Sequence, residues 1–221
     1  MSTTSFLFIT AENADVKLVN RLLLTLRNWE IGDPHWDNFV LVTSKAEILP
    51  TDMEPTQPPL QDFTRNEWKG AAIEDIESVV LRMDREKQSA HGKANGPSSS
   101  SSSSFDSNLS LFLVLDDQGA TDGTVALFQR AIDFDAEPVT FPERFNKFRT
   151  PWTNAYMDWC NLDISHIELE EMCDLDGADA GKSEADGVWW TYKNDTGELT
   201  FEEDRKKRDA VIKELAALGL A

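Results

Sequence analysis

Residues 176–183, DGADAGKS, come closest in this chain to a known chemical motif, because they end in Gly-Lys-Ser. A phosphate-binding loop requires G-x-x-x-x-G-K-[ST] between a strand and a helix, so that backbone N–H groups converge on the phosphates. Here Asp176 stands at the first glycine position, and no helix start follows. Residues 158–186 hold ten Asp or Glu and one Lys, which would repel a phosphate. We therefore expect an acidic loop without a phosphate site.

The same loop does not follow the calcium-binding pattern of an EF-hand. That pattern needs acidic residues at positions 1, 3 and 5 and glycine at position 6. Counted from Asp174, position 5 is Ala178 and position 6 is Asp179, so the pattern is broken twice. A solvated acidic loop is the favoured interpretation, and loose association of a divalent ion is the alternative.

A second set of carboxylates follows the most apolar segment of the chain, LSLFLVLD at 109–116. Asp116 and Asp117 close that segment, and Asp122 lies nearby. Carboxylates at the carboxyl ends of strands in open α/β sheets often bind ligands or magnesium. The favoured interpretation is a turn in which Asp and Gly end the strand and cap loop amides. A metal site at Asp116, Asp117 and Asp122 is the alternative.

The composition limits the classes of partner. The 221 residues include 40 Asp or Glu and 21 Lys or Arg, a formal net charge of -19. This charge repels nucleic acid and anionic membrane surfaces, so partners should be basic or neutral proteins. We also expect no transmembrane span, no signal peptide and no cofactor. Cys160 and Cys173 should be free thiols, as in the cytoplasm or the nucleus.

The order of predicted elements indicates an α/β fold. Residues 5–10 and 38–43 read as strands on either side of a helix beginning at residue 16, which is the start of a parallel sheet. A helix is predicted over 66–86 with Trp68 on its apolar face, then a serine-rich disordered insertion over 93–107. Residues 109–116 predict a central strand, and 124–132 its hairpin return, with a helix as the alternative for 124–132.

The second half of the chain predicts a strand over 145–151 and a helix opened by Pro151. Residues 188–201 predict a hairpin around Asn-Asp-Thr-Gly, followed by a final helix. That helix should turn three apolar side chains inward: Val211, Leu215 and Leu218.

Residues 149–172, RTPWTNAYMDWCNLDISHIELEEM, resemble a family of uncharacterised domains in fungal and bacterial proteins. In that family an Arg-x-Pro entry leads into an Asn-Leu-(Ser/Asp)-Ile-Ala-Asn-Met-Asp-Phe-Glu-Glu-Phe-like run. The chain departs from the run at His166, Leu169 and Met172. The resemblance covers most of residues 5–173 and implies a fold unit. Because the family has no assigned activity, the resemblance implies no mechanism.

The run itself, NLDISHIELEEM, is expected to form a short helical turn. Its inward side chains should be Ile164, Ile167 and Met172, with Asp163 as the helix N-cap.

Together these patterns predict one α/β domain over 1–175 with a mixed central sheet flanked by helices. An acidic Gly/Ala loop over 176–187 and a hairpin-helix extension over 188–221, packed on the domain, should follow. We expect a non-enzymatic module that binds a basic protein; the alternative is a small-ligand or metal-dependent enzyme with its site at residues 116–122. The residues expected to bind the basic protein are four acids and two adjacent tryptophans. The two tryptophans should point to opposite faces of a strand. These expected binding residues are Glu168, Glu170, Glu171, Asp174, Trp189 and Trp190.

Overall fold

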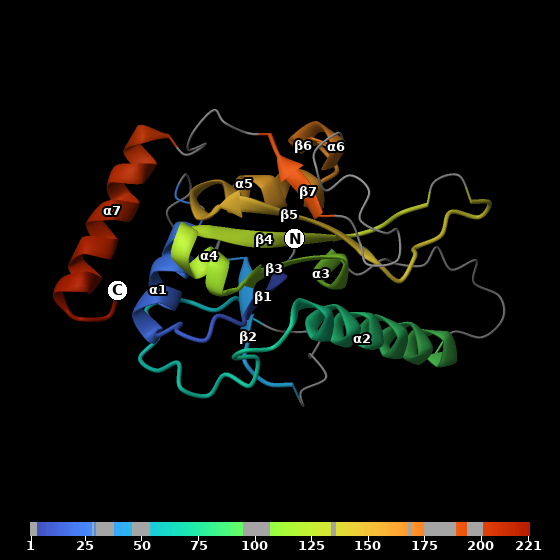
Figure 1. Ribbon diagram of the computed structural model, residues 1–221, viewed down its shortest axis with the longest axis horizontal. Helices are drawn as coiled ribbons and strands as arrows, with labels where there is room; N and C mark the ends of the chain where they lie inside the picture. The colour runs from blue at the N-terminus through green and yellow to red at the C-terminus, as the bar shows by residue number, and fades with distance from the viewer. Residues whose placement is uncertain are drawn as a thin grey trace.

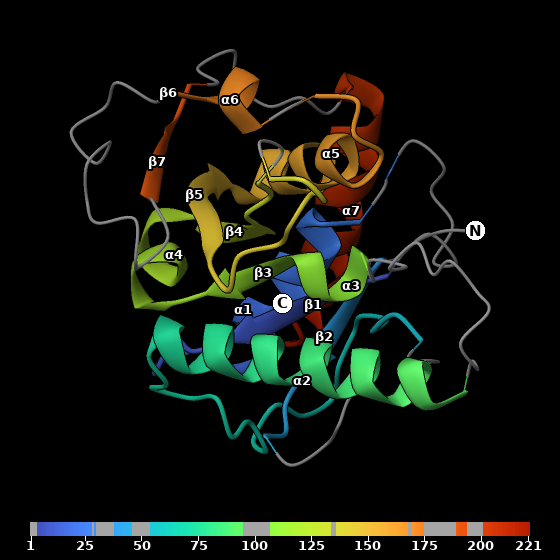
Figure 2. The same cartoon turned by 90° about the vertical axis from the view of Figure 1, so that its right-hand side faces the viewer.

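The structure is a computed structural model that describes residues 4–27, 29, 38–45, 54–94, 107–133, 136–167, 169–174, 189–193 and 201–221. Its strands form a seven-stranded mixed sheet in the order β2-β1-β3-β4-β5-β7-β6, with α2 on one face and α1 and α5 on the other (Figures 1 and 2). The strands are β1 (Ser5–Ile9), β2 (Phe39–Val42), β3 (Leu111–Leu115), β4 (Thr124–Arg130), β5 (Phe145–Pro151), β6 (Cys173–Asp174) and β7 (Trp189–Tyr192). The helices are α1 (Val16–Thr25), α2 (Ile73–Ala94), α3 (Ser107–Ser110), α4 (Asp117–Asp122), α5 (Trp152–Asp163), α6 (Leu169–Met172) and α7 (Glu202–Ala217). The predicted α/β class is confirmed.

The β1-α1-β2 unit forms as predicted. β1 pairs in parallel with β2 on one side and with β3 on the other. Asp15 begins α1 as its N-cap, because its carboxylate accepts the N–H of Leu18 at 2.8 Å. From β2 the chain passes through α2 to β3, which lies on the other side of β1. The two crossovers thus run in opposite directions along the sheet, and α1 and α2 lie on opposite faces of it.

Two cores follow from the alternation of side chains along the strands. In β1, Leu7 and Ile9 point into the core under α1 and α5, and Phe6 and Phe8 point into the core under α2. β3 is buried at all five residues and lies between β1 and β4, as its apolar sequence predicts.

The helix predicted over 66–86 begins later than expected. Trp68 is buried under α2 but lies in a turn before it, and α2 starts at Ile73. Asn66 holds this turn, because its side chain accepts the N–H of Trp68 and donates to the carbonyl of Ile9. Gly70 then adopts φ +70°, a left-handed conformation that interrupts a helix. Periodicity alone placed Trp68 on the right face and in the wrong element.

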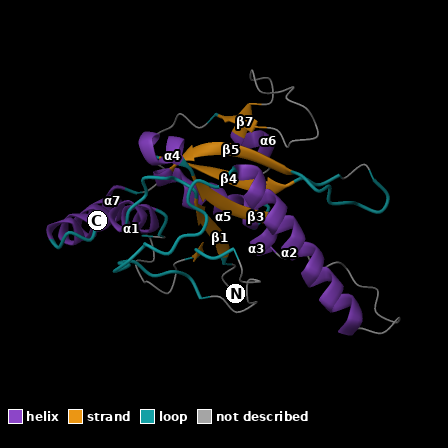
Figure 3. Cartoon of the chain, turned by 60° about the horizontal axis from the view of Figure 1, so that its bottom comes forward, coloured by secondary structure: helices purple, strands orange, loops and turns teal. Residues whose placement is uncertain are grey.

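The structure describes the two ends of the serine-rich insertion predicted over 93–107, and both ends are helical. α2, the long helix in Figure 3, continues to Ala94, and α3 begins at Ser107. The remainder of the insertion, 95–106, lies outside the described residues.

The segment after β3 confirms the hairpin interpretation over the helical alternative. β4 runs antiparallel to β3 and to β5, with Leu113 opposite Leu127. The intervening residues form the short helix α4, which ends at Gly123 with φ 70°. Pro151 precedes α5 as its N-cap residue, as expected.

Of the predictions for the C-terminal elements, one falls partly outside the described residues and one is wrong. β7 pairs in parallel with β5 and antiparallel with β6, and the second strand expected for its hairpin falls in 194–200, outside the described residues. In α7, Leu218 is 67% exposed instead of buried, because it stands at the helix C-cap. Val211 and Leu215 are partly buried.

No helix in the described part of the chain is both long and apolar enough to cross a bilayer.

Candidate functional site

The part of the predicted acidic region that the structure describes includes a surface at the end of α5 and on α6, with two acids, Asp163 and Glu171. We call it the α5–α6 surface and define it by Met157, Asp163, Ile164 and Glu171, which are exposed or partly exposed. Ile164, expected to face inward, is 63% exposed, because α5 runs on through Asp163 and leaves Ile164 at its C-cap. The other two residues expected inward do pack inward, Ile167 partly buried and Met172 buried.

Of the four acids predicted to bind a partner, Glu171 is exposed on α6. Glu168 lies outside the described residues. Glu170 belongs to α6 and Asp174 to β6, and their side chains also lie outside what the structure describes. The predicted loop 176–187, with its Gly-Lys-Ser, lies outside the described residues as well.

One acid of this region, Asp158, is buried and belongs to a hydrogen-bond network instead of the surface. It is 3% exposed, and its carboxylate accepts the Thr150 hydroxyl at 2.5 Å and the Tyr192 hydroxyl at 3.1 Å. Burial raises the pKa of Asp158 to about 6, although both hydrogen bonds favour the charged form and lower it. The network joins α5, β5 and β7.

Tyr192 is the member of this network that comes from the C-terminal part of the chain. Burial, followed by the charge of Asp158, raises the pKa of Tyr192 to about 12, so its hydroxyl keeps its proton and donates it. The Asn154 amide donates to the same hydroxyl at 3.4 Å, and the Tyr192 ring stacks on Phe148 at 5.6 Å. Tyr192 therefore fixes β7 to the core through both its ring and its hydroxyl.

Trp189 and Trp190 lie on opposite faces of the sheet, as their adjacent positions predict. Both are partly buried; Trp189 packs against the core under α2, and Trp190 against the core under α1 and α5. The Trp189 ring lies 5.3 Å from the Arg149 guanidinium and 5.6 Å from the Lys147 ammonium. Its π-face is thus engaged by cations of the same chain.

At the carboxyl end of β3, Asp116 forms an ion pair with Arg149 of β5. Its carboxylate accepts hydrogen bonds from both terminal guanidinium nitrogens, Nη1 at 2.9 Å and Nη2, and from the N–H of Gly119 at 2.8 Å. Burial raises the pKa of Asp116, but the bonds and charge of Arg149 and the Gly119 amide outweigh burial and hold that pKa below its usual value. Asp116 is thus an α4 N-cap, the turn interpretation that the sequence favoured.

The two other acids of the metal alternative are exposed. Asp117 accepts the backbone N–H of Glu12 at 2.8 Å, and Asp122 ends α4. Within the described ranges, no three His, Cys, Asp or Glu side chains gather closely enough to hold a metal ion. The arrangement lends the metal alternative no support, because the most buried of the three carboxylates already binds a guanidinium.

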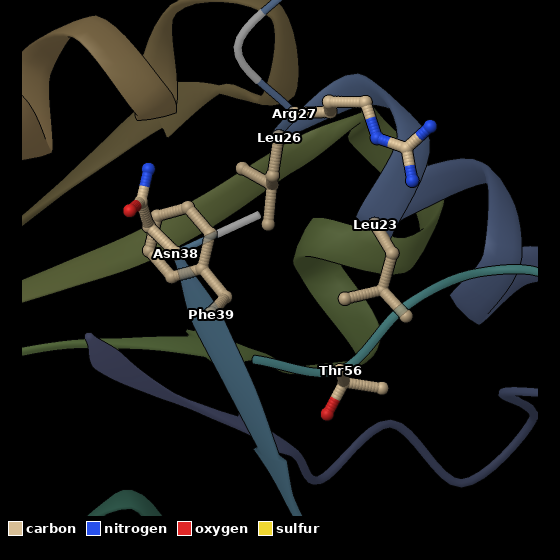
Figure 4. A pocket seen from close by; sticks show the side chains of 6 residues that line it. All are labelled: Leu23, Leu26, Arg27, Asn38, Phe39 and Thr56. Carbon is tan, nitrogen blue, oxygen red and sulfur yellow. The ribbon is translucent and has the colours of Figure 1, made fainter. Parts of the chain in front are cut away.

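A small hollow lies near the amino end of β2 and is shown in Figure 4. Its volume is about 10 Å³, which is room for about one water molecule and far below the roughly 300 Å³ at which small-molecule pockets begin. It lies at the amino end of its strand, whereas ligands of open α/β sheets bind at carboxyl ends. The residues that line it are Leu23, Leu26, Arg27, Asn38, Phe39 and Thr56.

Comparison with known proteins gives no match: no family model, curated protein or solved structure is similar to this chain. The resemblance of residues 149–172 to an uncharacterised family stays a prediction.

Sequence reasoning missed three residues that organise this region: Arg149, Thr150 and Tyr192. Arg149 and Thr150 are neighbours on β5, so they point to opposite faces, Arg149 to Asp116 and Thr150 to Asp158. The strand alternation in FNKFRTP could have shown the two faces. Their partners come from other elements and could not have been read from the local sequence.

Proposed function

We propose that this chain is a non-enzymatic module that binds a basic protein partner through its α5–α6 surface. The observation that carries the proposal is the distribution of charge. The basic side chains that lie within the sheet are matched by carboxylates of the same chain: Arg130 with Asp84, Lys147 with Glu77, and Arg149 with Asp116. These cations therefore do little to offset the exposed carboxylates of a chain with net charge -19.

The local composition supports the same surface. Residues 158–186 carry ten acids and one base. Among the acids there whose side chains the structure describes, only Asp158 is buried. The surface carries the partly buried Asp163, the exposed Glu171 and the exposed apolar side chains of Met157 and Ile164, a combination that suits a partner with both basic and apolar groups. Trp189 and Trp190 are partly buried, so they would contribute only the edges that remain exposed.

The proposal is tested by capturing partners on the tagged chain from native extract, with elution between about 0.1 and 0.5 M salt. A stoichiometric basic protein that elutes as salt rises is expected. Replacing Glu168, Glu170, Glu171 and Asp174 by Ser or Ala should abolish its capture. The matched control replaces four exposed acids elsewhere, Glu54, Asp75, Glu86 and Glu137, and should leave capture intact. Equal capture by both variants would contradict the proposal.

A further inference from the structure

β6 and β7, Cys173–Asp174 and Trp189–Tyr192, form a two-stranded unit at one edge of the sheet, which we call the β6–β7 ribbon (Figure 2). Few backbone pairs attach it. β7 pairs with β5 at two residues, whereas β4 pairs with β5 at seven. An edge element held by so few pairs should open at a lower free energy than the central strands.

Side chains supply the rest of the attachment, and they lie on the α5 face of the sheet. The ring of Tyr192 stacks on Phe148, and the fully buried Cys173 of β6 belongs to the same core. The Tyr192 hydroxyl donates to the carboxylate of Asp158, which is 3% exposed. Opening of the ribbon therefore takes Tyr192 away from a buried carboxylate and lets water reach it.

The surroundings of Asp158 hold no cation that would keep it charged while the ribbon is closed. Its carboxylate accepts from the hydroxyls of Thr150 and Tyr192, and Tyr192, the titratable group that faces it, keeps its own proton. The charged side chains of β5, Lys147 and Arg149, point to the opposite face of the sheet. Among the described residues, no charged side chain contributes to the titration of Asp158. A buried carboxylate in such a site is more stable when it is protonated.

We propose that the β6–β7 ribbon is a pH-sensitive switch, in which ionisation of Asp158 promotes local opening of the ribbon from the edge of the sheet. The closed ribbon favours protonated Asp158, whereas the open ribbon hydrates the carboxylate and so favours its charged form. Opening uncovers Phe148 and the backbone groups of β5 that β7 pairs with.

Linkage gives the direction and the size of the effect. The pKa of Asp158 is about 6 in the closed state and should fall to about 4, the ordinary aspartate value, in the open state. The opening equilibrium constant is therefore smallest below about pH 4, rises as pH increases through about 6, and is constant above about pH 7. The total rise is about a hundredfold, which is the ratio of the two acid dissociation constants.

The buried Cys173 thiol reports the opening. In the Cys160→Ser chain it is the single thiol, and a pyridyl disulfide modifies thiols even at acidic pH. Its rate of modification, divided by the rate for the same chain unfolded in urea at the same pH, gives the opening equilibrium constant. This constant should rise about a hundredfold between about pH 4 and pH 7. Asp158→Asn should abolish the rise, and the matched control Asp163→Asn, at a partly buried acid of the same helix, should preserve it.

The urea dependence of the same constant separates local opening from global unfolding. Local opening exposes little surface, so the constant should increase with urea less than half as steeply as the equilibrium constant for global unfolding. Equal slopes would overturn the proposal, because Cys173 would then be reached only through the unfolded chain. A constant that is the same at pH 4 and pH 7, or a rise that Asp158→Asn leaves intact, would also overturn it.

Discussion

The Tyr192 hydroxyl donates to Asp158 at 3.1 Å and so connects β7 to the helix α5 beneath it. Asp158 is buried, and hydroxyl groups, not cations, are the partners that favour its charged form. The pKa of Asp158 in the folded protein is therefore about 6, well above the usual pKa of an aspartate, so Asp158 stays protonated until the pH approaches that value. Attachment of the C-terminal strand is in this way linked to the titration of one carboxylate.

Asp158→Asn should remove a pH dependence of stability. Because the folded pKa is raised, the stabilising contribution is present below the unfolded pKa of about 4 and is lost as pH rises through about 6. Relative to the wild type, the variant should gain up to roughly 3 kcal/mol in free energy of unfolding between about pH 4 and pH 7. Urea denaturation of both proteins across this range measures the difference. A difference that stays constant with pH would contradict the assignment.

Tyr192→Phe should destabilise the protein while keeping its ring contact with Phe148. The change deletes the hydroxyl that donates to Asp158 and accepts from Asn154, and leaves both partners buried. The expected loss is about 1–3 kcal/mol at neutral pH, measured by urea denaturation. Hydrogen exchange should show faster opening of the β7 amides than of β3. Unchanged stability would mean that the bond has no net effect.

Asn20→Ala should release two distant segments at once. The Asn20 side chain is fully buried; its oxygen accepts the N–H of Leu60, and its amide donates to the carbonyls of Leu60 and Leu220. Deleting it leaves buried backbone groups unsatisfied, at a cost of about 2–4 kcal/mol. Thermal unfolding measures this cost, and limited proteolysis should show earlier cleavage after α7. The exposed Asn13→Ala is the matched control, with no expected change.

Arg149→Lys should destabilise the protein at the carboxyl end of β3 even though it keeps the charge. A lysine cannot form the two-nitrogen contact with Asp116 or lie flat over the Trp189 ring. We expect a loss of about 1–2 kcal/mol and a rise in the pKa of Asp116, which carboxyl NMR titration measures. Arg82→Lys, at an exposed position, is the control. Equal stability of the two variants would show that the paired geometry contributes nothing.

The sequence predicted the elements wherever local patterns specify them. The apolar run of β3 indicated a buried central strand, the helical spacing of apolar residues from Val16 indicated α1, and Pro151 indicated the start of α5. Trp68 was misplaced because its helical spacing is satisfied equally by a turn that Asn66 and Gly70 impose. Local periodicity reports which side chains face inward better than it reports the element that carries them.

The candidate site was less accessible to sequence reasoning, because its organisation depends on long-range pairs. Asp158 counted as one more acid in an acidic segment until Thr150 and Tyr192 were brought beside it by β5 and β7. Asp116 resembled a metal ligand until Arg149, 33 residues away, was placed against it. Exposed acids such as Glu171 need no such partner, and their surface position was predictable from charge alone.

The central claim is that the exposed acids of the α5–α6 region carry partner binding. Its most direct test is the salt dependence of the Kd for the captured basic protein, measured by calorimetry for the wild type and for the chain altered at Glu168, Glu170, Glu171 and Asp174. The wild-type Kd should rise at least tenfold between about 0.05 and 0.3 M salt, and the variant should bind weakly with a nearly flat dependence. Superimposable curves for the two chains would contradict the account.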